Sequence, residues 1–289
     1  MLGARMTTPD RRPPARSRSR TGTRAMLRAA LASGLLALAA FGGFGLAPSA
    51  PRLTPPETVS IPPGPALYRS SAEYRIGTRR IDPPPSPIEI RGFDIMAGQV
   101  TQEEYARCVA EGACQPTTRT PGAHLPQTGV NWSDATAYAA WLSERTGQEW
   151  RLPSDAEWLR AAAERGFDGA LGAEGENPSD RWLASYRSEV DRRGSADLVP
   201  RPSGHFGRNS LGLRDLAGNV WEWTTSCDEK ISLSSTGEQI ASERFCGVRV
   251  AQGKHRAFMV DFIRDARSGG CAAGIPPDFL GFRLVRDIP

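Results

Sequence analysis

The sequence predicts an α+β domain with few regular elements and long ordered loops. Three observations lead to this class: short segments carry helix-start signals, β-favouring runs lie before and after them, and residues 166–210 are rich in glycine, proline and charge without periodicity. The 289 residues are 39% hydrophobic, which is enough for one sizeable core. Loops this long within one domain are usually functional or held by metals or disulfides.

Each expected helix has a start and a stop. Thr101 with Glu104 and Ser154 with Glu157 have the spacing of a capping box, and Ser133 is expected to cap the helix between them. A glycine predicts the end of each helix: Gly112, Gly147 and Gly166. Strands are expected where apolar and β-favouring residues recur, at 65–76, 88–100, 245–250 and 281–286.

The N-terminal part changes character along its length. Residues 1–25 are rich in Arg, Ser, Thr and Pro, which predicts a disordered basic leader. Residues 26–49 have a basic start, an uncharged stretch and a small-residue site, which predicts a secretory signal, with a single membrane anchor as the alternative and Met26 as a second candidate start codon. Residues 50–64 form a proline-rich linker. The domain itself is expected over 57–289, in a periplasmic or extracellular protein.

The charge balance argues against nucleic acid as a partner. The formal charge is +4, but residues 1–28 hold eight arginines against the single acid Asp10. The rest of the chain therefore has 28 basic and 31 acidic side chains. A domain with this balance lacks the basic footprint of nucleic-acid binding.

Five cysteines fit an oxidising compartment. Cys108 and Cys114 are close in sequence, Cys227 and Cys246 frame a polar loop, and Cys271 is left over. The pairing Cys108–Cys114 with Cys227–Cys246 is one hypothesis, and free buried thiols are the alternative, because spacing alone does not fix connectivity.

The run from Leu211 to Trp223 is the main candidate for a site. Glu222 lies between Trp221 and Trp223, and Asp215 precedes it by seven residues across a glycine turn. A carboxylate between two indoles is costly to bury unless it is paired, hydrogen-bonded or bound to a cation. Asp215 and Glu222 with carbonyls of the turn would offer hard oxygens to calcium. A salt bridge from Glu222 to one of the arginines is an equally weighted alternative.

Several short motifs occur in order along the chain: Val100-Thr101, Val130 to Ala135, Arg151 to Trp158, Gly212 to Trp223 and Gly281-Phe282-Arg283. Taken together, this ordered set resembles the formylglycine-generating enzyme family, the sulfatase-modifying factors. The resemblance spans roughly residues 57–289 and implies a C-type-lectin-like fold variant, which agrees with the few regular elements expected above.

The resemblance implies a calcium site and a substrate cleft. The calcium would be bound by the side chains of Asp215 and Glu222 and by the carbonyls of Gly218 and Val220. Trp221 would be a wall of the cleft. The other cleft residues that the resemblance suggests are Arg264, Arg267 and Arg283.

The chain departs from the family at the catalytic position. Family members oxidise a substrate cysteine to formylglycine with copper(I) held by two cysteines, and soft thiolates suit this ion whereas carboxylates do not. In the run 259–267, Asp265 occupies the place of the second cysteine and nothing upstream replaces the first. Cys271 lies downstream alone and is the remaining, weak candidate. Calcium is therefore expected as a cofactor, and copper is not.

Three functional hypotheses follow. The first is an exported, calcium-stabilised binding or accessory protein without copper-dependent oxidase activity, which holds a peptide or protein client in the cleft. The second is a periplasmic enzyme that acts on a peptide or siderophore-type substrate. The third is an oxidase with a displaced thiol pair, Cys246 and Cys271, which would leave Cys227 without a partner.

Overall fold

The computed structural model confirms an α+β architecture with few regular elements. It describes residues 51–82, 85–117, 122, 124–166, 183, 187, 199–265, 270–271 and 279–288. The predicted leader (1–25) and the predicted signal or anchor (26–49) lie outside these residues. Within them, no helix has the length and apolar character needed to cross a membrane.

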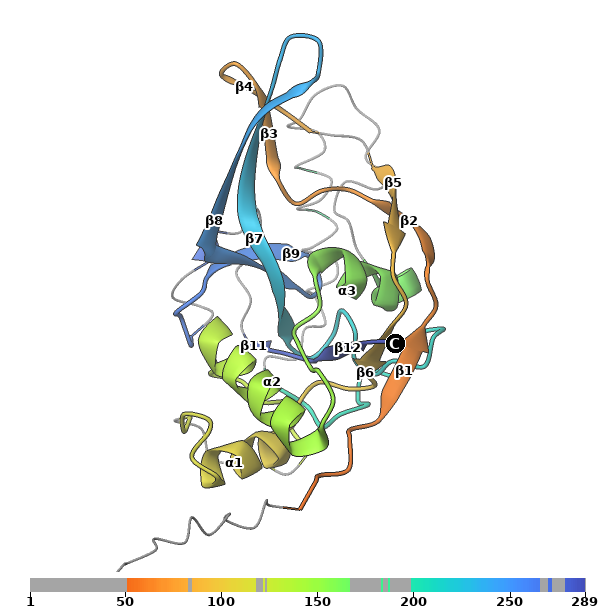
Figure 1. Ribbon diagram of the computed structural model, residues 1–289, viewed down its shortest axis with the longest axis vertical. Coiled ribbons are helices and arrows are strands. Elements are labelled where there is room, and N and C mark those ends of the chain that lie inside the picture. The colour runs from red at the N-terminus through yellow and green to blue at the C-terminus, as the bar shows by residue number, and fades with distance from the viewer. Residues whose placement is uncertain are drawn as a thin grey trace, which may run out of the picture. The chain divides into compact units, whose positions relative to one another are not determined.

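The described elements are short except for α2 and the long hairpin β7–β8 (Figure 1). The helices are α1 (Gln102–Ala110), α2 (Trp132–Thr146), α3 (Asp155–Ala162) and the 3-10 turn η1 (Ala163–Arg165). The strands are β1 (Thr58–Ile61), β2 (Gly64–Tyr68), β3 (Glu73–Ile76), β4 (Arg79–Ile81), β5 (Ser86–Ile90), β6 (Phe93–Met96), β7 (Trp221–Leu233), β8 (Gln239–Gln252), β9 (Arg256–Val260), β10 (Gly270–Cys271), β11 (Leu280–Gly281) and β12 (Val285–Asp287).

The largest sheet of the described residues is built around this hairpin and has the strand order β10-β9-β8-β7-β3-β4. Near its start β7 also pairs in parallel with β11, which places Gly281 opposite Glu222. Gly281 is required there, because a Cβ at this position would lie 2.5 Å from the carbonyl oxygen of Gln127. This close approach brings the last segment of the chain against the start of β7. Two smaller sheets have the orders β1-β6-β12 and β2-β5.

The caps of α1 and α3 are those predicted from the sequence, and the cap of α2 is not. Thr101 and Ser154 each form a capping box with the glutamate three residues later. The prediction that Ser133 caps α2 is wrong: Asn131 is the N-cap and exchanges hydrogen bonds with Asp134. The aspartate side chain can serve the third helical position in place of glutamate, so the helix starts earlier than Ser133.

Some expected segments differ in extent. Residues 58–61, inside the expected linker, form β1 and pair with β6. The expected strand 88–100 is divided between β5 and β6, and the expected strand 65–76 between β2 and β3. Residues 211–220 form no strand, because Asp215, Ala217 and Asn219 all have positive φ angles. This irregular backbone directs carbonyls inward at the point where a site was expected.

Two apolar clusters form the core of the described residues. One packs α1 and α2 against the start of β7 and the last segment, with the ring of Phe282 5.4 Å from that of Tyr138. The other joins α3 and β6 through Trp158, Phe93 and Ile95. Two fully buried charged residues adjoin the first cluster in sequence. Arg283 follows Phe282, and Glu222 lies between Trp221 and Trp223.

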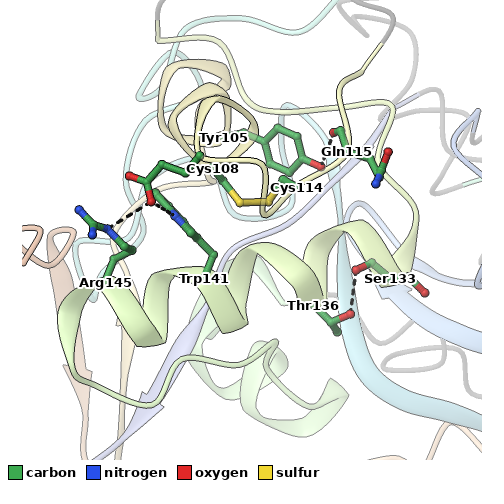
Figure 2. Close-up of a disulfide and its surroundings, with 9 residues drawn as sticks. Tyr105, Cys108, Cys114, Gln115, Ser133, Thr136, Trp141 and Arg145 are labelled. Carbon is green, nitrogen blue, oxygen red and sulfur yellow. Dashed lines mark hydrogen bonds and ion pairs between the residues drawn. A yellow bond between two sulfur atoms is a disulfide. The ribbon is translucent and has the colours of Figure 1, made fainter. Parts of the chain in front are cut away.

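The predicted pairing of four cysteines is confirmed. Cys108 is bonded to Cys114 and Cys227 to Cys246. Figure 2 shows the first bond above α2, with Tyr105 and Trp141 beside it. The indole of Trp141 also donates to Glu111 at 2.8 Å, which ties the end of α1 to α2. Disulfides of this kind indicate an oxidising environment of the sort that exported proteins meet.

Candidate functional site

The candidate site is a buried carboxylate whose hydrogen-bonding capacity is full. Glu222 has no solvent exposure, and each of its two oxygens accepts two N–H groups. Oε2 accepts from the indole of Trp158 at 2.7 Å and from Nε of Arg283 at 2.6 Å. Oε1 accepts from Nη2 of Arg283 at 2.8 Å and from Nε2 of Gln99 at 2.9 Å. A carboxylate offers about four lone-pair positions, so all are in use.

Arg283 is the charge partner of Glu222. Its guanidinium is fully buried and contacts the carboxylate in the two-point geometry that arginine favours. Two further N–H groups donate to the carbonyls of Met96 at 3.2 Å and Arg214 at 2.9 Å. The pairing of β11 with β7 brings Arg283 to this position. The salt bridge that the sequence left as an alternative is therefore the arrangement in the structure, although the partner could not be chosen among the many arginines.

The carboxylate of Asp215 is hydrogen-bonded to the loop at 204–206 and not to this ion pair. Its φ of +57° belongs to the left-handed region, which Asp tolerates better than most residues. The carboxylate accepts from the backbone N–H of Gly204 at 2.6 Å and of Phe206 at 2.9 Å. The side chain thus closes the loop 204–215, while the backbone carbonyl of Asp215 points to Gln99.

Gln99 joins the loop to the ion pair, and the sequence did not identify it. Its Nε2 contacts Oε1 of Glu222, and it lies 3.3 Å from the carbonyl oxygen of Gly218 and 3.5 Å from that of Asp215. The side chain is 4% exposed. Its position directly before the Val100-Thr101 motif is the only signal that the sequence carried.

The residues present do not fit the calcium site that the resemblance implies. Calcium needs oxygen lone pairs at about 2.3–2.6 Å. The four lone-pair positions of Glu222 are all used by donors, and the carboxylate of Asp215 accepts from two backbone N–H groups of the loop at 204–206. In addition, Nε2 of Gln99 occupies the point between the carbonyl oxygen of Gly218 and Oε1 of Glu222.

The residues predicted to line one cleft do not lie together. Trp221 is 6% exposed, donates to the carbonyl of His255 at 3.1 Å and has Gly253 against its ring. Arg264 is on the surface, where it pairs with Asp134 at 2.8 Å. Arg283 is buried, because the ion pair with Glu222 takes it into the core. Arg267 lies outside the described residues.

The cysteine positions leave no thiol pair in the described part of the chain. The bond between Cys227 and Cys246 uses the sulfur that the displaced-pair hypothesis needs, so that hypothesis does not hold in this structure. Asp265 is exposed. Cys271 is in β10, where its backbone pairs with Phe258 of β9.

An open cavity of about 630 Å³ lies beside Gln99 and was not predicted. Arg214 and Arg208 are among its lining residues, as are Glu57, Glu104 and His124. Arg214 pairs with Glu57 at 2.8 Å, and the hydrogen bond and charge of Arg214 hold the pKa of Glu57 below its usual range. The cavity therefore presents charges of both signs. No sequence pattern indicates this cavity, because its residues come from segments far apart in the chain.

Comparison with known proteins decides the family. The family model of the sulfatase-modifying factor enzyme 1-like domain matches residues 43–288. The chain belongs to this family. The resemblance seen in the sequence motifs is thereby confirmed, and with it the fold class. Members of the sulfatase-modifying factor family bind calcium and copper.

The chain is similar to both active and inactive relatives. It is 36% identical over 119 residues to the formylglycine-generating enzyme of Streptomyces coelicolor, covering 39% of this chain and 35% of that one. It is 31% identical over 179 residues to that of Mycobacterium tuberculosis, covering 57% and 54%. The inactive Cα-formylglycine-generating enzyme 2 of Mus musculus is 36% identical over 110 residues, covering 35% and 32%. The matches thus span about a third to a half of these relatives.

Among solved structures, PvdO from Pseudomonas aeruginosa matches with a TM-score of 0.49 and 22% identity, covering 81% of this chain and 95% of that one.

Proposed function

We propose that this chain is an exported sulfatase-modifying factor protein that does not oxidise cysteine with copper and that works as a binding or accessory protein. The observation that carries the proposal is the state of the cysteines: four of the five are in disulfides. Copper(I) is held by soft thiolates, and a disulfide sulfur is not a thiolate. One remaining thiol, Cys271, cannot supply the pair that the family's oxidation requires.

The cavity beside Gln99 is the proposed binding place. It replaces the cleft around Trp221, because Trp221 and Arg283 are buried. Arg208 and Arg214 line it together with Glu57 and Glu104. A peptide suits these walls, because its carbonyls and carboxylates can accept from the arginines while its N–H groups and cationic side chains donate to the glutamates. The existence of an inactive relative in mouse is consistent with a family member that lacks the oxidase reaction.

The absence of oxidation is tested with a cysteine-containing peptide. The full-length secreted protein is loaded with copper(I), incubated aerobically with the peptide and analysed by mass spectrometry. We expect the peptide cysteine to remain unconverted. Formation of formylglycine would overturn this part of the proposal, and a Cys271→Ser control would then show whether that sulfur takes part. Any other enzymatic change of the peptide would favour the alternative of a periplasmic enzyme.

Binding in the cavity is tested by selecting peptides from a random displayed library on the native protein. The selected peptides are then measured against two charge-reversed variants. Arg208→Glu changes the cavity wall, whereas Arg244→Glu changes an exposed arginine of β8 outside it. We expect at least tenfold weaker binding to Arg208→Glu and unchanged binding to Arg244→Glu. Equal binding to both variants, or no selected peptide, would reject the cavity as a peptide site.

A further inference from the structure

Three oxygens converge on one nitrogen in the core. Oε1 of Glu222 and the carbonyl oxygens of Gly218 and Asp215 lie 2.9, 3.3 and 3.5 Å from Nε2 of Gln99. An amide nitrogen carries only two hydrogens, so three acceptors exceed its donors. Oxygens gathered in this way around a single point are the usual surroundings of a hard cation. Here the point is occupied by a side-chain amide.

The charge at this point is already balanced. A cation would neutralise Glu222, but Arg283 does so with two N–H···O contacts of 2.6 and 2.8 Å in a site without solvent exposure. Trp158 supplies a further N–H at 2.7 Å. Adding a divalent cation here would require removal of the Gln99 donor and would bring positive charge next to the guanidinium.

We propose that Gln99 and Arg283 take the place of calcium in this chain. The amide of Gln99 holds the carbonyls of the loop 215–218, and Arg283 balances Glu222, so the domain is held together at this position without a metal. A single substitution would convert this arrangement into a candidate cation site. Gln99→Glu replaces the central N–H₂ group with a carboxylate oxygen. Gln99 also lines the cavity, but the inference does not rest on the proposed function, because its tests measure stability and metal binding and not peptide binding or thiol chemistry.

The substitution Gln99→Glu has a defined consequence. It places a second carboxylate within hydrogen-bond distance of Glu222 in a buried site, where like charges destabilise each other. Arg283 balances one of the two charges. The remaining negative charge and the carbonyl oxygens are hard ligands of the kind that calcium prefers. The variant is therefore expected to depend on calcium, whereas the native protein does not.

Thermal unfolding of the full chain in calcium or in EGTA tests this inference. The native protein should unfold at the same temperature in both. Gln99→Glu should unfold several degrees lower in EGTA, and calcium should restore most of the loss. Gln127→Glu is the matched control: Gln127 is equally buried, but its Nε2 contacts only neutral oxygens, of Thr117 and Thr128. This control should be destabilised to the same extent in both buffers.

Terbium provides a second readout, because a lanthanide bound beside Glu222 would be excited through Trp158. Gln99→Glu should give saturable luminescence that calcium displaces, and the native protein should give none. If Gln99→Glu folds only when calcium is present, the inference is supported. If it gains no calcium dependence or folds in neither buffer, the converted site is rejected. A calcium-dependent rise in the unfolding temperature of the native protein that Glu222→Gln abolishes would overturn the proposal directly.

Discussion

At the scale of single residues, Glu222 shows how far a sequence pattern leads. Its position between Trp221 and Trp223 correctly indicates a buried carboxylate that needs a partner. The partner itself comes from 61 residues further along the chain, and Gln99 comes from 123 residues before. No local pattern encodes such contacts, because they depend on the pairing of β11 with β7. The resemblance to the family favoured calcium as the partner of Glu222, whereas the N–H donors around Glu222 favour its ion pair with Arg283.

Removing one member of this pair should be costly. Arg283→Met would leave the charge of Glu222 buried and uncompensated, so the free energy of unfolding should fall by about 3–5 kcal/mol. The double variant Arg283→Met/Glu222→Gln should lose less than the single variant, since no charge remains buried. Urea unfolding measures both. Arg286→Met, which removes a partly exposed pair with Asp94, is the control and should cost only about 0.2–1 kcal/mol. Equal losses for Arg283→Met and Arg286→Met would contradict this account.

At the scale of elements, sequence patterns predicted mainly the features that depend on contacts between neighbouring residues. Capping boxes gave the starts of α1 and α3, because these hydrogen bonds lie within four consecutive residues. The start of α2 was placed too late, since Asn131 and Asp134 form the same box with different side chains. The run 211–220 is irregular, because this loop is set by tertiary contacts of Asp215. The cavity lies beyond any local signal.

The cap of α3 predicts how stability depends on pH. Burial raises the pKa of Glu157, but hydrogen bonds from Arg151 and the backbone of Ser154 outweigh it, and the net pKa lies below 4.5. The ionised side chain therefore stabilises the fold above this pH, and its contribution is lost as the pH falls through the lowered pKa.

We accordingly expect Glu157→Gln to lower stability at pH 7 and to flatten the loss of stability below pH 4.5. Urea unfolding between neutral and acid pH measures this dependence, with the exposed Glu149→Gln as the control. A variant curve parallel to that of the native protein through this range would show that the cap does not titrate as described.

At the scale of the whole molecule, the chain has the scaffold of its family, and the changes in calcium and copper chemistry are the two proposals made above. The scaffold is fixed by the motifs and by the disulfides, which the sequence suggested and the structure confirms. The functional cleft could not be predicted, because residues assigned to it by resemblance are divided between the core, the surface and a part that the structure does not describe. A cleft depends on the packing of distant segments, whereas a motif depends on short spacing.

The state of the cysteines tests the central claim most directly. The full chain carries five cysteines, of which four are bonded. Titration of accessible thiols on the secreted, non-reduced protein after unfolding should therefore find one thiol per chain, and peptide mapping should assign it to Cys271. Three or more thiols per chain, or a map in which Cys246 and Cys271 are both free, would restore a thiol pair and contradict the account.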